Sequence, residues 1–532
     1  MSGIQLNTAN EALGKDVHKS PTYPVQSDWK PWQLVLFRIA FVFFILMSVP
    51  NSIEWYKNAF SIDWTNLHYR DPYDIARFGS GLDWFGNKIF GSTLEGYAIW
   101  VITLLFSTGV GLIWTAAEKL TKKETSNYDR LNYWLRVIVR YRAGIGIIGF
   151  GFTKLLPTQM PYPSLGLLNT DFGDFTLQKI YWLSIGIVPW YQVFAGVVEI
   201  VAGLLLFFRK TTTLGSILLF GALGDIVYVN FAYDGGVHVY SSYFVLLAAF
   251  LLVQDTPRIF NLLVREKFTL PARYYYPALT QTWQKITRYG VKSTIIGVFL
   301  ILFFYLSLTN LLFDPYKQPA VKGATELRGN YNVTEFRINN ETIPYSPEDT
   351  IRWSRATFEN WSSLTFKVNK PTPLDLSNGG GSPMRDIDRT FELTGTGGGQ
   401  RVFYYQADTV NQVLYLQDKF KARNPGDRGK EQSVEDTHPV DWIPEKSLAN
   451  IGDETYKIDP RASSTRRIRE YANAPKTEKR NRMILQYQSI NNGDKVILTG
   501  IDENKNSLYI VLDRFKKDYT LSQSTIKAGK YD

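Results

Sequence analysis

Two carboxylates stand inside long apolar runs of this sequence. Glu199 lies near the middle of "WYQVFAGVVEIVAGLLLFFRK", and Asp225 lies in "LGSILLFGALGDIVYVNFAYD". A carboxylate in hydrocarbon costs about 3 kcal/mol or more, so it needs a cation, a proton or a water-lined cavity. We therefore expect both side chains to face the interior of a helical bundle. There Glu199 either serves a ligand or a proton, or makes a structural hydrogen bond to a neighbouring helix.

Other polar side chains on these apolar segments complete a predicted intramembrane site. Lys154 ends the glycine-rich run "GIGIIGFGFTK", where it either pairs with Glu199 or extends to the membrane surface. Arg142 lies near the start of that run and either joins the site or anchors in lipid headgroups. Three other arginines, Arg38, Arg136 and Arg140, are expected to anchor in headgroups. His238 is either interfacial or catalytic. The predicted site comprises Glu199, Asp225, Lys154, Arg142, Asn230, His238 and Gln192, and the candidate partners of Glu199 are Lys154, Arg142, Asp225 and Asn230.

The residues that carry most other chemistry are missing or scattered. Cysteine is absent, which excludes disulfides, thiolate nucleophiles, Fe–S clusters and Cys-based zinc sites in this chain. The four histidines are far apart, so the sequence predicts no metal site. No hydrolase elbow, metal-binding helix, Walker loop or dinucleotide fingerprint occurs. We assign no catalytic residue and expect no certain cofactor, with quinone as the one open candidate.

The elements that must position these residues are membrane-spanning helices. The 532 residues have a mean hydropathy of -0.15, which averages an apolar part before residue 314 and a polar part after it. We expect a polar tail (1–32), a transmembrane helical domain (33–313) and an exterior domain (314–532). A crossing needs about 20 mostly apolar residues. Seven segments qualify: 33–50, 97–117, 131–156, 182–207, 212–231, 238–254 and 291–313.

Charge fixes the expected orientation. Lysines and arginines concentrate in the loops after the second, fourth and sixth segments, and cytoplasmic loops carry such an excess. The amino terminus is therefore expected in the cytoplasm and the carboxy-terminal domain outside it, as in a multi-pass protein of the bacterial cytoplasmic membrane with a periplasmic or extracellular domain. The net charge of +10 is then explained by these loops rather than by nucleic acid. Expected partners are membrane lipids and other membrane or periplasmic subunits.

Residues 131–264 resemble the DoxX family of small four-helix membrane proteins. The resemblance is carried by the glycine-rich helix ending in "GFTKLLP", by "AGVVEIVAGLLLFFRK", and by a last helix entered through "GGVHVYSSYFVLLAAFLL". It implies a four-helix core, and it places Lys154 and Glu199 on the family's recurring Lys and Glu positions. The family includes a subunit similar to those of thiosulfate:quinone oxidoreductases, together with many members that have no known activity.

The exterior domain has the pattern of an all-β fold. Short segments rich in aromatic and β-branched residues alternate with turn signals, which predicts a barrel or a sandwich. The opening "LRGNYNV" and the closing hairpin around "DENKN" resemble a lipocalin-like barrel, whose interior is either filled by side chains or holds a small apolar ligand. The predicted strands lie in 329–345, 350–360, 362–368, 389–395, 401–408, 411–420, 483–490, 494–502 and 506–515.

Two stretches interrupt these strands. The glycine-rich "NGGGSPMRDIDRTFELTGTGGGQ" precedes no helix and no Gly-Lys-Ser/Thr, so we expect a flexible loop rather than a phosphate cradle. Residues 421–482 form a predicted insertion that ends in a basic run. That run is either a solvated helix face or a contact for anionic lipid or a partner.

These features favour a component of a cell-envelope complex that is either a noncatalytic module or binds a lipid or another lipid-like ligand. Two alternatives remain open at this stage. The first is a membrane redox component that interacts with quinone and uses Glu199 or Asp225 for protons. The second is a small-solute transporter, for which Pro189 inside a predicted span is a slight indication of a broken helix.

Overall fold

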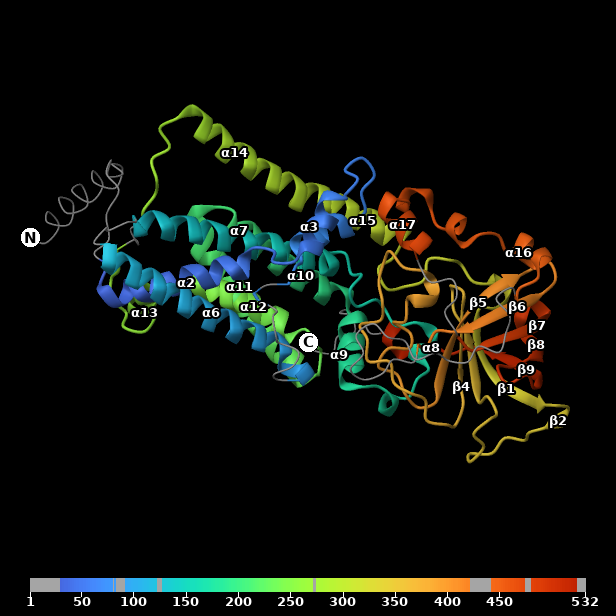
Figure 1. Ribbon diagram of the computed structural model, residues 1–532. Helices are drawn as coiled ribbons and strands as arrows, with labels where there is room; N and C mark the ends of the chain where they lie inside the picture. The colour runs from blue at the N-terminus through green and yellow to red at the C-terminus, as the bar shows by residue number, and fades with distance from the viewer. Residues whose placement is uncertain are drawn as a thin grey trace, which may run out of the picture.

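The computed structural model describes residues 29–79, 81–82, 91–121, 127–270, 274–421, 442–473 and 480–523. It consists of a bundle of long helices followed by a β-barrel, and the two lie end to end in Figure 1. Most of the predicted tail 1–32 lies outside the described residues. So does 422–441 of the predicted insertion.

Every predicted span falls on helical structure. The long helices are α2 (Pro31–Ser48), α6 (Gly91–Thr121), α7 (Tyr128–Leu155), α10 (Pro189–Leu206), α11 (Thr212–Ala232), α12 (His238–Leu252), and the run of α14 (Thr282–Ile296), η3 (Gly297–Leu302) and α15 (Phe303–Phe313). Shorter helices connect them: α3 (Ile53–Phe60), α4 (Arg70–Ala76), α8 (Leu165–Leu168), η1 (Phe172–Asp174), α9 (Leu177–Gly186), η2 (Arg209–Thr211) and α13 (Thr256–Leu263).

Several of these helices can span a membrane. Five of the described helices are long and apolar enough, and a sixth span results if α12 and α13, which meet at 82°, count as one. α7 is not among them because it carries ionisable residues along most of its length. The total of seven therefore stays a prediction. The segment 182–207 is wrong as one helix: α9 ends at Gly186, and α10 begins at Pro189, where a ring without an N–H fits a first turn.

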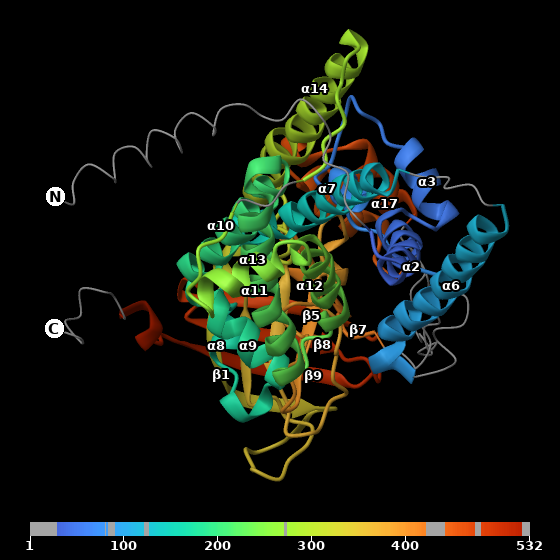
Figure 2. The same cartoon turned by 90° about the vertical axis from the view of Figure 1, so that its left-hand side faces the viewer.

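α7 packs on α10 backbone to backbone. A Cβ atom at Gly196 would lie 2.3 Å from the backbone nitrogen of Leu155, and one at Gly203 would lie 3.0 Å from the carbonyl oxygen of Gly144. Only glycine fits at such distances, so the glycines of both helices are what allow this close approach. α7 also contacts α2, α12 and α15, and the end-on view of the bundle shows it among them (Figure 2).

The carboxy-terminal domain is a closed barrel of eight antiparallel strands. The strands are β1 (Gly329–Ile338), β3 (Arg355–Phe358), β4 (Ser363–Lys367), β5 (Gln400–Asp408), β6 (Val413–Asp418), β7 (Arg482–Ile490), β8 (Lys495–Ile501) and β9 (Ser507–Phe515). Each pairs with the next, and β9 pairs with β1 to close the barrel. β2 (Glu341–Thr342) extends β1 as a short hairpin. The predicted hairpin around "DENKN" joins β8 to β9. Of the two predicted all-β folds, the barrel is confirmed and the sandwich is wrong.

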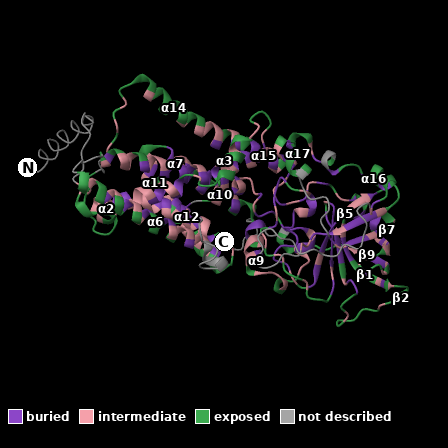
Figure 3. Ribbon diagram, in the orientation of Figure 1, coloured by how far each residue is buried: buried purple, intermediate pink, exposed green. Residues whose placement is uncertain are grey.

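Apolar side chains fill most of the barrel. The core cluster includes Tyr331, Phe403 and Leu498. Much of the strand ribbon is accordingly coloured as buried in Figure 3. Near one mouth, Trp353 stacks on Phe366 with ring centroids 3.7 Å apart, and a cavity of about 450 Å³ opens above them. The barrel is therefore largely filled, and this mouth offers room for a ligand.

The predicted strand 389–395 is wrong. This segment is a series of turns in which the Leu393 and Thr394 N–H groups donate to the carbonyl oxygen of Thr390. Its charged side chains Arg389 and Glu392 are buried in ion pairs, which a barrel strand with one solvent-facing side would not provide. The glycine-rich loop that contains it is also packed rather than loose, since Ser382, Asp386 and Thr396 are buried.

Three segments join the barrel to the bundle. α8 and η1 lie along β3 and β4, where the Gly166 N–H donates to Oε1 of Glu359 at 2.7 Å and Lys367 pairs with Asp174. From the predicted insertion, α17 (Thr465–Asn473) reaches back to α4 through Arg466, which pairs with Asp71 and Asp74. β6 pairs with β7 directly, so the described part of the insertion supplies no barrel strand apart from Arg482, the first residue of β7. The described part of its basic run contacts the protein itself.

Candidate functional site

Lys154 and Glu199 form an ion pair inside the bundle. Nζ of Lys154 donates to the two carboxylate oxygens of Glu199 at 2.8 and 2.9 Å. Glu199 is 2% exposed and Lys154 is also buried, so each charge compensates the other in an apolar environment. The backbone approach of α7 and α10 brings the two side chains together. Lys154 therefore does not extend to the membrane surface, and Glu199 has the first of its candidate partners.

Gln192 has a structural role at the start of α10. Its Oε1 accepts from the Met160 N–H at 3.0 Å, and its Nε2 donates to the Met160 carbonyl at 3.1 Å. These two bonds fasten α10 to the loop that follows α7. Gln192 precedes Glu199 by seven residues, about 10 Å along a helix, so the two do not share a site.

Arg142 contacts the protein interior rather than lipid headgroups. Its Nη1 donates to the Ala76 carbonyl at 2.7 Å, in the short helix α4 between α2 and α6. Arg142 is 6% exposed. Arg38 is also buried and pairs with Glu118, so two of the four predicted headgroup anchors are instead interior contacts.

The remaining predicted residues lie apart from Glu199. Asp225 is exposed, because Leu219 and Leu223 define the buried face of α11 and Asp225 is rotated by about 200° from Leu223. The expectation that Asp225 faces the bundle interior is wrong. Asn230 is buried and donates to the Ile226 carbonyl one turn earlier. His238 is buried against the ring of Tyr97. Of the seven predicted residues, the structure brings together only Lys154 and Glu199.

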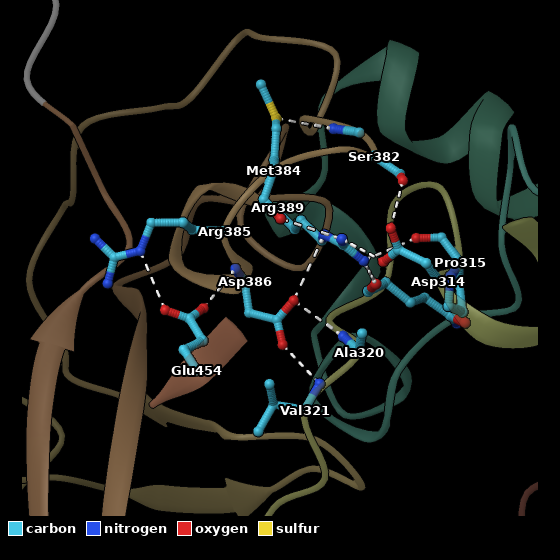
Figure 4. Close-up of polar contacts among 12 residues, drawn as sticks. Asp314, Pro315, Ala320, Val321, Ser382, Met384, Arg385, Asp386, Arg389 and Glu454 are labelled. Carbon is cyan, nitrogen blue, oxygen red and sulfur yellow. Dashed lines mark hydrogen bonds and ion pairs between the residues drawn. The ribbon is translucent and has the colours of Figure 1, made fainter. Parts of the chain in front are cut away.

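A buried ion network at the junction of the two domains was not predicted (Figure 4). Asp314, just after α15, accepts from Nη2 of Arg389 at 2.6 Å and from Oγ of Ser382 at 2.7 Å, and it also pairs with Arg467. Asp386 accepts from the Ala320 and Val321 N–H groups. The concentration of charged residues in "SPMRDIDRTF" was the one feature of the sequence that pointed to this network. The network fixes the barrel onto the end of the last membrane helix.

Two buried amines lie beside this network. Nζ of Lys179, in α9, donates to the carbonyl of Phe391, and burial lowers the pKa of Lys179 to about 7. Nζ of Lys317 lies 3.7 Å from the ring centroid of Trp182, and burial, followed by the nearby Lys179 charge, holds the Lys317 pKa well below its usual range. The junction therefore holds two amines that titrate abnormally.

The largest cavity among those described is a basic hollow between α7, the end of α10 and α14. Its volume is about 810 Å³. Figures 1 and 2 show α14 standing away from the other helices. Aromatic and aliphatic side chains form its walls, and among the lining residues that the structure describes there is no Asp or Glu. Its cations are Arg130, Arg140, Arg209, Arg288 and Lys292.

Arg140 occupies the inner wall of the basic hollow. It is 8% exposed, and its Nη1 donates to Oγ1 of Thr212 at a long 3.3 Å. Its Nε has no hydrogen-bond partner within the described part of the chain. A second cavity of about 450 Å³ shares Arg140 and Arg209 with the hollow. This arrangement suits an anion with an apolar body, because a buried cation without a partner costs free energy that an anion would recover.

Comparison with protein-family models, with curated proteins and with solved structures finds no match for this chain. The DoxX-like resemblance of 131–264 and the lipocalin-like resemblance of the barrel therefore stay predictions from their motifs. Among the described residues, no group of three or more His, Asp or Glu side chains is placed to hold a metal ion. The site that geometry defines best is the basic hollow, and the Lys154–Glu199 ion pair lies further along α7 without lining it.

Proposed function

We propose that this chain is an integral protein of the bacterial cytoplasmic membrane that binds an anionic phospholipid in the basic hollow and carries its barrel outside the cytoplasm. It acts as a noncatalytic component of a cell-envelope complex. The observation that carries the proposal is the lining of the hollow: five cations, aromatic walls and no carboxylate among the described lining residues. The DoxX-like motifs support a ligand-binding bundle.

The shape of the hollow matches the two parts of a phospholipid. Arg140 lies at its inner wall, where a phosphate would satisfy the unpaired Nε, and the exposed Arg209 lines the same cavity. Trp283 is 64% exposed on α14, and Val291 and Ile295 line the same cavity, so acyl chains have apolar surface to cover. Lys292 and Arg288 close the side near α14. A charge-assisted contact at a membrane surface contributes about 1 kcal/mol per cation.

The position of the basic hollow in the bundle supports the same ligand. The hollow is formed by the start of α7, the end of α10 and α14, which the charge distribution assigns to the cytoplasmic interface. Anionic lipid headgroups lie at that depth. The quinone-linked and transporter interpretations have no comparable cavity in their favour and stay predictions.

Retention of lipid by the purified protein tests the proposal. Full-length protein in nanodiscs of equal phosphatidylglycerol and phosphatidylcholine is transferred to detergent, and bound lipids are counted by native mass spectrometry. Wild type should retain phosphatidylglycerol, and Arg140→Gln/Arg209→Gln should retain it about thirtyfold less tightly. The matched control is Arg265→Gln/Lys267→Gln, which removes two exposed charges outside the hollow. Equal retention by the two double variants would contradict the proposal.

A further inference from the structure

The guanidinium of Arg142 is held by one of its three nitrogens. Nη1 donates to the Ala76 carbonyl, whereas Nε and Nη2 are buried and have no hydrogen-bond partner in the described ranges. Gly146 makes room for the group, since a Cβ atom there would lie 2.8 Å from Nη1. Arg142 is thus buried in the bundle, and its Nε and Nη2 donors have no acceptor among the described residues.

The two free nitrogens form one edge of the guanidinium plane. Nε–H and one Nη2–H are parallel, and this side-on pair matches the two oxygens of a carboxylate. The buried hydroxyl of Tyr240 lies close enough to Arg142 to interact with the guanidinium, although no hydrogen bond of ordinary geometry joins that hydroxyl to a described residue. The free edge of Arg142 and the Tyr240 hydroxyl therefore lie together between α7 and α12.

Charge balance at this place favours an anion. Neither Arg142 nor its neighbour Arg77 forms an ion pair with a carboxylate in the described part of the chain; Arg77 donates to the Tyr73 hydroxyl and lies 5.5 Å from the centroid of the Tyr240 ring. A buried cation without a counterion is costly, and an arriving anion removes that cost. One buried guanidinium balances one negative charge, which suits a monoanionic carboxylate better than a phosphate.

The aromatic rings around Arg142 indicate the chemistry of the rest of the bound molecule. The ring of Phe78 lies 3.9 Å from the guanidinium carbon and that of Tyr243 lies 5.2 Å from it. Phe78 and Arg77 also line a cleft of about 370 Å³ between α3, α4 and α17. Phe78 therefore separates Arg142 from a cleft at the end of the bundle nearest the barrel. These rings are the apolar surface that the rest of such a ligand would contact.

We propose that Arg142 and Tyr240 bind the carboxylate of a small apolar monocarboxylic acid that enters from the cleft beside Phe78. Nε and Nη2 of Arg142 donate side-on to its two oxygens, and the Tyr240 hydroxyl donates to one of them. This site is separate from the basic hollow. Arg140 and Arg142 are two residues apart on α7, so their side chains point about 160° apart around the helix.

Thermal unfolding of the full chain in detergent tests this site with benzoate and hexanoate as probes, hexanol as the neutral control and phenylphosphonate as the alternative oxyanion. Both carboxylates should raise the Tm of wild type in a saturable manner. Arg142→Lys keeps the charge but loses the side-on pair, so the shift should disappear. Tyr240→Phe removes only the hydroxyl and should weaken binding about tenfold. Arg265→Lys, the matched control at an exposed arginine outside both sites, should respond as wild type does.

Three results of the unfolding experiment would contradict the proposed carboxylate site. An unchanged carboxylate-dependent shift in Tyr240→Phe would overturn the proposal even if Arg142→Lys failed to fold. No shift with either carboxylate in wild type would also overturn it, and a shift with phenylphosphonate alone would assign the site to a different anion. Lipid retention is measured independently, so failure of this site leaves the basic hollow intact as a lipid site.

Discussion

Replacing Lys154 by methionine should destabilise the helical bundle strongly, whereas replacing Lys154 and Glu199 together should not. Nζ of Lys154 lies 2.8 Å from Oε1 of Glu199, and Glu199 is almost completely buried. Removing the cation strands the carboxylate, which typically costs about 3–5 kcal/mol. Exchanging the pair for Met and Gln removes both charges at similar volume, and such exchanges are often neutral.

The assay is a double-mutant cycle. The free energy of unfolding is measured for wild type, Lys154→Met, Glu199→Gln and the double variant in one detergent, with the helical circular dichroism signal as the readout. The expected interaction free energy is about 3 kcal/mol. Lys119→Met is the matched control because Lys119 is exposed on α6, and it should change stability by less than about 0.5 kcal/mol. A Lys154→Met variant within about 1 kcal/mol of wild type, or a double variant as unstable as the sum of the singles, would refute the reasoning.

Three further predictions concern the barrel and its attachment. The folded pKa of Lys179 is about 7 and its ordinary value is 10.5, so between these pH values the unfolded chain binds a proton that the folded chain does not. Stability should then rise with pH in this window, by up to about 1.4 kcal/mol per unit, and Lys179→Met should remove that slope. Arg467→Gln takes one of two arginines from buried Asp314 and should speed proteolysis around α17, unlike the exposed Arg461→Gln. A reporter active only in the cytoplasm should be silent when fused after Asp532, and activity there would reverse the orientation.

The sequence was most informative where the physical pattern was local and regular. Apolar runs of about 20 residues placed the long helices, and alternation between turn signals placed the eight barrel strands. Glycines at helix-packing spacing indicated the α7–α10 contact, and that contact made Lys154 a natural partner of Glu199. Each of these signals lies within one or two elements of the chain.

The failures came from contacts between distant segments. Asp225 looked interior because it lies mid-helix, but the rotation of α11 is set by packing of Leu219 and Leu223, which the sequence does not reveal. The segment 389–395 has the composition of a strand, yet Arg389 is drawn into a pairing with Asp314 some 75 residues earlier. The basic hollow combines residues of α7, α10 and α14, and only the tertiary fold assembles them.

A density map of the full chain in nanodiscs that contain phosphatidylglycerol tests the central claim most directly. The account predicts a lipid-shaped density in the basic hollow, with its phosphate within hydrogen-bond distance of Arg140 and Arg209 and its acyl chains between α7 and α14. Arg140→Gln/Arg209→Gln should lose that density while the fold is unchanged. A hollow that is closed by α14 packing directly on α7, or one whose density persists in the double variant, would contradict the account.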